Sequence, residues 1–398
     1  MPSVFDSGFL IDQFIKKFHG SGSHLFTKCL HSSRRRCLGP LVRSESQRVV
    51  CQETVAGRLQ FSPSTAINQL EMWQAGSFDP KTIDRELGLA ESLGFTSVRV
   101  FLHDLLWQQD AKGFTRRMDD FLALAHKHHI GVMFVLFDSC WDPDPKLGKQ
   151  RDPKPHVHNS GWMQSPGHEY LQHPERFDEL KPYVVGVIHH FRNDPRIDFW
   201  DLYNEPYNKS DLPEYSKLEP ADKAEAAHLL LEKTFRWARE AKPSQPLSSG
   251  VWRGPWADPA KLSAMEQLQL NESDIITFHS YGKPEDAKHC VENLRRYQRP
   301  IICTEYMARP AGSTFNPILG YFKQEHVGAY NWGFVSGKTQ TIYPWDSWRT
   351  NYTAEPPLWF HDIFRANGSP YDPKEVAFIR EVTSPKSATP LLSGPDGR

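Results

Sequence analysis

The stretch Ile197-Asp198-Phe199-Trp200-Asp201-Leu202-Tyr203-Asn204-Glu205-Pro206 joins an apolar run to an amide, a carboxylate and a proline. Its apolar half predicts a buried strand, because few of its positions favour contact with water. Pro206 has no N–H to donate to a neighbouring strand, so strand pairing must stop there. Asn204 and Glu205 are therefore expected at the carboxyl end of the strand. A lone Asn-Glu-Pro is more often a helix N-cap or a loop, so its meaning depends on the rest of the chain.

A repeating pattern of apolar strand, polar loop and amphipathic helix surrounds this stretch. Asp79-Pro80 is typical of an N-cap and a first helical turn, and Gly94 ends the helix that follows. Further strands are predicted over 55–61, 97–102, 131–137, 246–252, 274–281, 300–305 and 328–333. Further helices are predicted near 118–125, 175–191, 221–241, 287–297, 317–326 and 373–382.

Eight units of this kind predict an α/β fold, a (β/α)8 TIM barrel forming a single catalytic domain. The alternative is an open, doubly wound parallel sheet. Against that alternative, no G-x-G-x-x-G or other phosphate-binding glycine loop follows the first strand.

The two ends of the chain differ from its centre. Residues 1–54 are rich in Lys and Arg and lack sustained periodicity, which predicts an irregular basic N-terminal extension. The barrel is expected over 55–385 and a disordered tail over 386–398. Residues 5–18 have the spacing of an amphipathic helix, but they lack the uninterrupted apolar core and the cleavage site of a signal peptide. No run of eighteen apolar residues predicts a transmembrane helix.

Composition narrows the classes of partner. The formal net charge of −1 provides no field to attract nucleic acid or an acidic membrane surface, so neither partner is expected. The 12 Trp residues include several in predicted loops, where flat rings suit stacking on the apolar faces of sugars as well as ordinary packing. The 6 Cys residues form no C-x-x-C pair, which argues against a zinc ribbon or a dense disulfide framework.

Polar residues gather at the predicted strand ends, which share one face in a barrel of this type. They are Arg99 and His103 at the second strand, Asn204 and Glu205 at the fourth, His279 and Tyr281 at the sixth, Glu305 at the seventh and Trp332 at the eighth. Two carboxylates on separate strands suit glycosidic cleavage. One protonates the leaving oxygen, and the other attacks the anomeric carbon or activates a water.

Asn204-Glu205-Pro206 and Thr304-Glu305-Tyr306, together with the other polar residues, resemble the retaining glycoside hydrolases of clan A, nearest to family 5, the cellulase and mannanase type. The resemblance spans residues 55 to about 382. It implies that Glu205 is the general acid/base and Glu305 the nucleophile. The substrate-binding residues that it and the strand ends imply are Arg99, His103, Trp141, Asn204, His279, Tyr281 and Trp332.

Individual roles follow from the same resemblance. Asn204 matches the residue that hydrogen-bonds the sugar 2-hydroxyl, and Trp332 matches the platform under the sugar. Arg99 and Tyr281 match the groups that hold the nucleophile ionised and oriented, and His279 matches a subsite hydrogen-bonder. The resemblance implies a carbohydrate substrate, no cofactor and no metal, and a secreted or periplasmic location.

Electrostatics supports the two carboxylate roles. A guanidinium beside Glu305 is expected to lower its pKa, and the charge of Glu305 at roughly 5–5.5 Å is expected to raise the pKa of Glu205. One feature departs from the family pattern. The third strand ends in Phe137-Asp138-Ser139-Cys140-Trp141, where family 5 members commonly carry histidine, so the substrate contacts on that side stay open.

The long segment 138–174 contains four histidines and several aspartates, which suit a metal site, solvated loop residues or substrate contacts. It has no H-E-x-x-H or EF-hand spacing, so solvated loop residues or substrate contacts are favoured over a metal site. The absence of G-x-S-x-G argues against a serine esterase.

The sequence thus predicts a retaining hydrolase of O-glycosidic bonds, β-linked, in a polysaccharide or oligosaccharide. The alternative is a catalytically inactive carbohydrate-binding barrel, which loss of either carboxylate would have favoured. The glycan, the choice between internal and terminal cleavage, and the oligomeric state stay open.

Overall fold

A computed structural model of the chain describes residues 57–384, and its core is one sheet of parallel strands. The strands are β1 (Gly57–Gln60), β2 (Ser97–Phe101), β3 (Gly131–Asp138), β4 (Ile197–Asn204), β5 (Leu247–Ser248), β6 (Ile276–His279), β7 (Ile301–Tyr306) and β8 (Gly328–Asn331). Their order is β5-β4-β3-β2-β1-β8-β7-β6. A parallel bridge between Val251 and Phe278 joins the two outer strands. The sheet therefore closes into a barrel.

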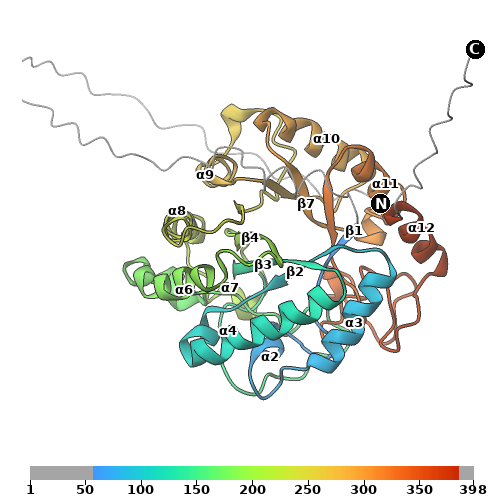
Figure 1. Cartoon of the computed structure of the whole chain (residues 1–398), viewed down its shortest axis with the longest axis horizontal. Helices are drawn as coiled ribbons and strands as arrows, with labels where there is room; N and C mark the ends of the chain where they lie inside the picture. Colours follow the sequence, from blue (N-terminus) through green and yellow to red (C-terminus); the bar gives the residue numbers. More distant parts are fainter. Residues whose placement is uncertain (1–56, 385–398) are drawn as a thin grey trace, which may run out of the picture. The chain divides into compact units, whose positions relative to one another are not determined.

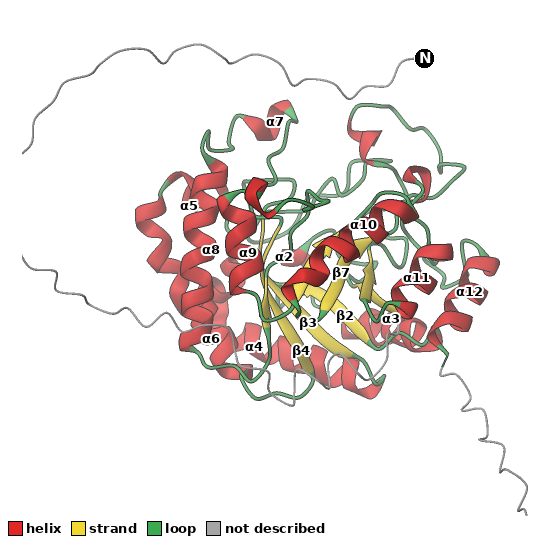
Figure 2. Cartoon of the chain, turned by 90° about the horizontal axis from the view of Figure 1, so that it is seen from above, coloured by secondary structure: helices red, strands yellow, loops and turns green. Residues whose placement is uncertain are grey.

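Helices follow the strands and surround them (Figure 1). They are α2 (Gln69–Trp73), α3 (Pro80–Ser92), α4 (Asp104–Lys127), α5 (His168–Gln172), α6 (Lys181–Phe191), α7 (Pro213–Ser216), α8 (Lys223–Glu240), α9 (Ala264–Glu272), α10 (Pro284–Leu294), α11 (Phe315–Gln324) and α12 (Pro373–Thr383). Figure 2 shows long loops and the short helix α7 gathered at one end of the strands. These loops carry the candidate site.

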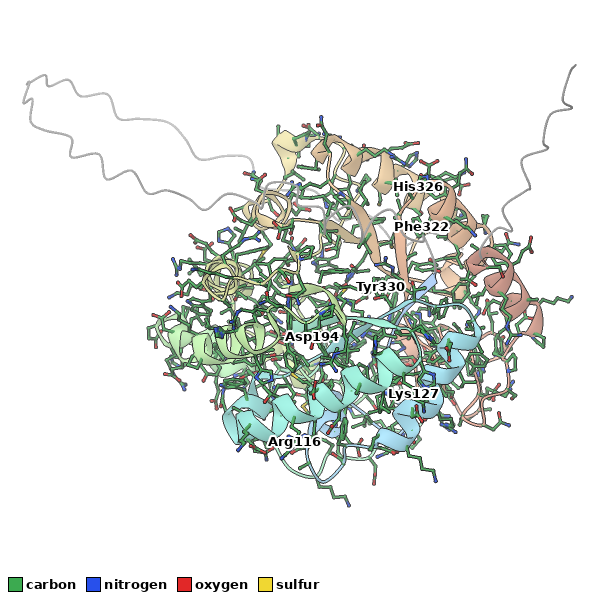
Figure 3. All side chains as sticks on the ribbon, in the orientation of Figure 1. Arg116, Lys127, Asp194, Phe322, His326 and Tyr330 are labelled. Atoms are coloured by element: carbon green, nitrogen blue, oxygen red, sulfur yellow. The ribbon has the colours of Figure 1, made fainter. Side chains whose placement is uncertain are left out.

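Side chains fill the interior of the barrel. Met133, Phe199, Ile275, Ile302 and Tyr330 form one buried cluster inside it. Tyr330 lies at the centre of the molecule, whereas Arg116 and Lys127 are exposed on α4 (Figure 3). A filled interior is what a (β/α)8 barrel requires, since its strands enclose a packed core and not a pore.

The predicted TIM barrel is confirmed, and the open sheet is excluded because β1 pairs with both β2 and β8. Helix α3 begins as predicted, with the Asp79 side chain accepting from Thr82 N. The helix predicted over 175–191 is instead a 3₁₀ turn followed by α6, because Pro182 cannot donate to a preceding turn. The strand predicted over 246–252 has only two ladder residues, Leu247 and Ser248.

Helix α9 was not predicted, since its apolar residues do not form one stripe. Its Ser263 and Glu266 form a capping box, a signal that the sequence does contain. The expectations for residues 1–54 and 386–398, including the helix over 5–18, lie outside the described residues. Within 57–384, no helix is long and apolar enough to cross a membrane.

Candidate active site

Glu205 and Glu305 lie at the carboxyl ends of β4 and β7. Strand β4 ends at Asn204, and Glu205 takes a left-handed backbone conformation with φ 43° before Pro206. Such a conformation is costly for a residue with a side chain and is often found where function demands it. Both carboxyl groups are buried, at 9% exposure for Glu205 and 4% for Glu305.

Two donors hold Glu305. Arg99 Nη1 donates to its Oε1 at 2.8 Å, and Tyr281 OH donates to its Oε2 at 2.7 Å. The guanidinium of Arg99 is fully buried and also donates to Asp201 Oδ2 at 2.8 Å. Burial lowers the pKa of Arg99, but the two carboxylates outweigh this and raise it. Arg99 is therefore a permanent cation beneath Glu305.

Three side chains contact the other carboxyl group. His279 Nδ1 lies 2.7 Å from Glu205 Oε1, and Asn208 Nδ2 donates to Oε2 at 2.6 Å. The Cys140 thiol donates to the same Oε2 at 3.4 Å. His279 Nδ1 also lies 3.6 Å from Glu305 Oε2, so this ring stands between the two carboxyl groups.

Arg99 lowers the pKa of Glu305 as predicted, but the net pKa directions of both carboxyl groups in the free protein are opposite to those expected. Burial raises the pKa of Glu205, but the hydrogen bond and charge of His279, with the bond from Asn208, outweigh it and lower that pKa. Burial raises the pKa of Glu305 by more than His279 and Arg99 lower it. Burial lowers the pKa of His279, but the two carboxylates outweigh burial, so the net pKa of His279 is raised. The prediction left out two causes: His279, which lies between the carboxyl groups and lowers the pKa of Glu205, and burial, which raises the pKa of Glu305.

Asn204 is held in one orientation. Its Oδ1 accepts from Arg99 Nη2 at 2.7 Å, and its Nδ2 donates to Asp138 Oδ1 at 2.9 Å. Trp162 Nε1 donates to Asp138 Oδ2 at 2.6 Å. Burial raises the pKa of Asp138 to about 6, against these hydrogen bonds. The amide assignment of Asn204 thus follows from its two fixed neighbours.

A cavity of about 390 Å³ opens over these groups. Among the predicted residues it is lined by Trp141, Asn204, Glu205, His279, Tyr281, Glu305 and Trp332. Arg99 lies beneath it and reaches it only through Glu305 and Asn204. His103 does not line it: this side chain is fully buried and accepts from Leu105 N at the start of α4.

Six further residues line the cavity and were not predicted as site residues: Cys140, His158, Asn159, Asn208, Trp252 and Trp345. Trp252 and Trp345 lie in predicted loops, and the high number of loop tryptophans was the one feature of the sequence that pointed to a sugar-binding role for them. Asn208 is placed by a turn in which its N–H donates to Glu205 O at 2.8 Å. His158 and Asn159 come from the long segment 138–174, whose conformation no local pattern specifies.

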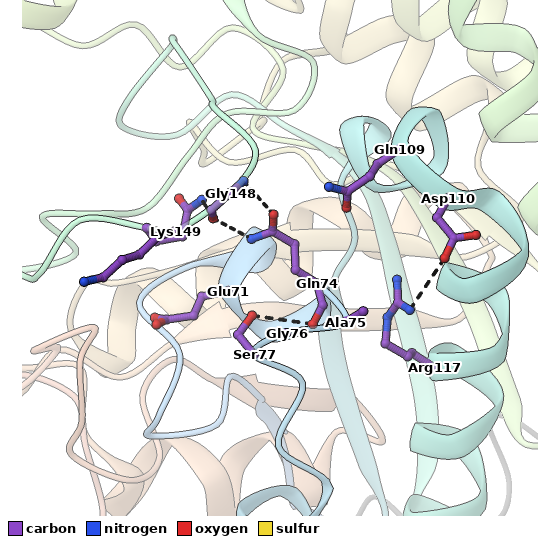
Figure 4. Close-up of a pocket in the computed structure, with 11 residues that line it drawn as sticks. Glu71, Gln74, Ala75, Gly76, Ser77, Gln109, Asp110, Arg117, Gly148 and Lys149 are labelled. Carbon is purple, nitrogen blue, oxygen red and sulfur yellow. Dashed lines mark hydrogen bonds and ion pairs between the residues drawn. The ribbon is translucent and has the colours of Figure 1, made fainter.

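The structure also has a larger cavity, of about 490 Å³, between α2, α4 and residues 148–150 (Figure 4). Gln74 crosses it to donate to Gly148 O at 2.9 Å. No aromatic side chain lines this cavity, and its acids are engaged by cations, Glu71 by Lys338 and Asp110 by Arg117. It has none of the features of a sugar site, so the smaller cavity is the candidate.

One group of side chains within residues 57–384 has ligand atoms close enough for a metal ion. It consists of Glu205, His279 and Glu305, with one ligand atom of each within 4.8 Å of the others. The histidines and aspartates of segment 138–174 do not form such a group in the described part of the chain.

No protein-family model and no curated protein sequence matches this chain. Solved structures do. They include the exo-β-1,4-mannosidase Op5Man5 from Opitutaceae bacterium strain TAV5, with 17% identity, 83% of this chain and 59% of that chain covered, and a TM-score of 0.54. Another is GH5_18 from Streptomyces cattleya in complex with GlcNAc, with 12% identity, 83% and 80% covered, and a TM-score of 0.52.

A third is the β-mannanase from the blue mussel Mytilus edulis, with 15% identity, 73% and 89% covered, and a TM-score of 0.51. At these identities the similarity lies in the fold. The chain shares its (β/α)8 barrel with these structures, and this is the fold that the resemblance in sequence implied.

Proposed function

We propose that the protein is a retaining glycoside hydrolase in which Glu305 is the nucleophile and Glu205 the general acid/base. The observation that carries this proposal is the distance between the two carboxyl groups. Their nearest ligand oxygens lie within 4.8 Å. Retaining enzymes hold their carboxyl groups roughly 5–5.5 Å apart, whereas inverting enzymes leave about 6.5–9.5 Å for a water molecule. Direct attack by a carboxylate fits this spacing.

The surroundings of Glu305 suit a nucleophile. Arg99 and Tyr281 each hold one oxygen, so the carboxylate is oriented and its negative charge is stabilised by a cation and a hydroxyl. When Glu305 attacks the anomeric carbon, the glycosidic bond breaks and the leaving oxygen takes a proton. Water then attacks the glycosyl-enzyme and releases Glu305.

Glu205 supplies that proton. In the free protein the raised pKa of His279 and the lowered pKa of Glu205 favour this proton on His279 Nδ1, 2.7 Å from Glu205 Oε1. Transfer along this bond leaves a neutral imidazole and a protonated Glu205, which then protonates the leaving oxygen. Formation of the glycosyl-enzyme removes the charge of Glu305, so Glu205 remains ionised and accepts a proton from the attacking water.

β-Mannosides are the first substrates to test. The similar structures include a β-mannanase and an exo-β-1,4-mannosidase. The tryptophans around the cavity provide apolar faces for a sugar ring, and Asn204 is fixed beside Glu305, where it can bind the 2-hydroxyl.

Azide rescue tests both roles. Glu305→Ala is expected to lose essentially all hydrolysis of a dinitrophenyl β-glycoside, and azide should restore turnover with an α-glycosyl azide as product, because azide replaces the nucleophile. Glu205→Ala should give the β-glycosyl azide, because azide attacks the glycosyl-enzyme. Full residual hydrolysis by Glu305→Ala would refute the assignment, and binding of glycans without turnover by the wild-type protein would favour a carbohydrate-binding barrel.

A further inference from the structure

Two long loops cross the end of the barrel and are joined to each other. The β3 loop (residues 139–167) and the β8 loop (residues 332–372) leave strands that have β2 and β1 between them. Asn159 N donates to Thr339 O at 2.8 Å, and His158 Nδ1 lies 2.8 Å from Tyr343 O. Trp348 Nε1 donates back to His158 O at 2.8 Å. We call this joined pair of loops the loop bridge.

The loop bridge is seated on the strand ends beneath it. Trp162 of the β3 loop packs edge-on against Phe101 at the end of β2, with ring centres 5.2 Å apart, and against Trp332 at 5.8 Å. From below, Asn68 Nδ2 donates to Gly161 O at 2.8 Å. Buried aromatic packing and hydrogen bonds to the backbone give the bridge a fixed position. It therefore walls off the cavity on the side of β1, β2 and β8.

Two residues of the bridge that carry hydrogen-bond acceptors, Asn159 and His158, line the cavity at this wall. Asn159 is 1% exposed, has a left-handed φ of 46°, and its Oδ1 has no hydrogen-bond partner among the described residues. A buried carboxamide oxygen without a donor is costly, and strained backbone of this kind is retained where a ligand uses it. His158 also lines the cavity, and burial lowers its pKa to about 4, against the effect of Tyr343 O. Its ring is thus neutral, with Nδ1–H donating to Tyr343 O and Nε2 left as an acceptor.

The opposite side of the cavity lies at β5, across the barrel from β1, and Trp252 lines the cavity there. Trp345 of the β8 loop also lines the cavity and is 41% exposed. Under the proposed function, the sugar that reacts lies against Glu305 and the Trp332 platform, on the side of the bridge. Glu205 follows β4, which lies across the barrel from β8, so the leaving group departs on the side away from Trp332.

We propose that the loop bridge closes the glycone end of the cavity, and that Asn159 and His158 accept hydrogen bonds from hydroxyl groups of the non-reducing terminal sugar. A chain that continued beyond this sugar would meet the bridge. The protein therefore acts from the end of a neutral β-linked oligosaccharide and releases one sugar per event. The inference rests on the proposed function. The similar structures do not decide it, because they include both the exo-β-1,4-mannosidase Op5Man5 and an endo-1,4-β-D-mannanase from Thermotoga petrophila RKU-1.

The test uses β-1,4-linked manno-, gluco-, xylo- and N-acetylglucosamine oligosaccharides of two to five units that carry a fluorophore at the reducing end. We expect the labelled chain to shorten by one sugar at a time. The same oligosaccharides carrying a 4,6-O-benzylidene group (for the xylo series, a 4-O-benzyl group) at the non-reducing end should resist cleavage. Early products of several lengths, or cleavage of the blocked chains, would overturn the inference.

Dinitrophenyl β-glycosides separate the two proposals. If none of them is hydrolysed, the proposed function fails. If one is hydrolysed but oligosaccharides are cut internally, the glycosidase stands and only the closed end is refuted.

Variants test the bridge and the acceptor separately. Gln340 Nε2 donates to Lys154 O at 2.7 Å and so helps to join the two loops. Gln340→Ala should loosen the loop bridge and allow cleavage of the blocked chains. The control is Gln267→Ala, which removes an exposed side chain bonded to Leu262 O and should not allow that cleavage. Asn159→Gly keeps the left-handed backbone and removes the acceptor. It should lower kcat/KM for the oligosaccharide about tenfold, whereas Asn159→Asp, which keeps an acceptor, should lose less. Equal activity of Asn159→Gly and the wild type would refute the role of Asn159.

Discussion

Removal of the Tyr281 hydroxyl should show how far this group stabilises the ionised form of Glu305. In the structure Tyr281 OH donates to Glu305 Oε2 at 2.7 Å, and this bond lowers the pKa of Glu305 against the effect of burial. Tyr281→Phe removes the donor and keeps the ring. A hydrogen bond to a charged group contributes about 1.5–3 kcal/mol, which corresponds to about a 10- to 150-fold loss in rate. The loss is expected in kcat, because Glu305 regains its charge when the glycosyl-enzyme breaks down.

The assay is the pH profile of kcat and kcat/KM on a dinitrophenyl β-glycoside. Loss of the donor raises the pKa of Glu305, so the acidic limb of kcat/KM should move to higher pH. Tyr183→Phe is the matched control. It removes a hydroxyl that donates to Leu136 O at 2.9 Å, far from the cavity, and should leave both profiles unchanged. If Tyr281→Phe stays within threefold of the wild type with an unmoved acidic limb, the hydroxyl does not stabilise the Glu305 carboxylate.

Three further predictions concern stability. Arg99→Met leaves the buried Asp201 and Glu305 without their cation, so the free energy of unfolding in a urea titration should fall by about 3–5 kcal/mol. The double variant that also carries Asp201→Asn should recover part of this loss. An unchanged urea midpoint of Arg99→Met would contradict the buried ion pairs. His158 takes up a proton near pH 6.5 in the unfolded chain and only near pH 4 in the folded chain, so the free energy of unfolding should fall by about 3 kcal/mol as the pH drops from 6.5 to 4. His158→Gln, which has no titrating ring, should not show this fall. Parallel plots of unfolding free energy against pH for the two proteins would contradict the prediction. Gly337→Ala places a Cβ 2.3 Å from Ser64 O and should lower the stability measured by thermal unfolding by about 1–3 kcal/mol. The control Gly76→Ala, whose Cβ meets nothing within 4 Å, should be neutral. Equal melting temperatures of the two variants would show that the backbone around Gly337 and Ser64 moves to relieve the clash.

The barrel was predictable because its signals are local. The apolar run before Asn204-Glu205-Pro206 has the pattern of a buried strand, and the alternation of strands with helices along the chain requires a parallel sheet. The positions of Glu205 and Glu305 at one end of that sheet follow directly, since parallel strands all finish at the same face. Short elements such as β5 and α9 were misjudged or missed because tertiary pairing decides them.

The chemistry within the site depends on contacts that sequence spacing does not encode. Glu205 and Glu305 are 100 positions apart, and His279 stands between their carboxyl groups only because β6 pairs with β7. That placement lowers the pKa of Glu205, whereas burial of the whole group is what raises the pKa of Glu305. His103 matched the strand-end pattern as well as Arg99 did, yet one turn of backbone directs it into the start of α4.

The barrel and the strand that each carboxylate follows can be read from the sequence, because hydrophobic periodicity and turn residues act over a few neighbouring positions. The groups that contact each carboxylate, and the contacts that join the two loops over the cavity, depend on tertiary packing. The loop bridge is the clearest case. Asn159 and Thr339 come from loops whose composition predicts only irregular backbone, and their contact exists because the barrel brings β3 and β8 to either side of β1 and β2.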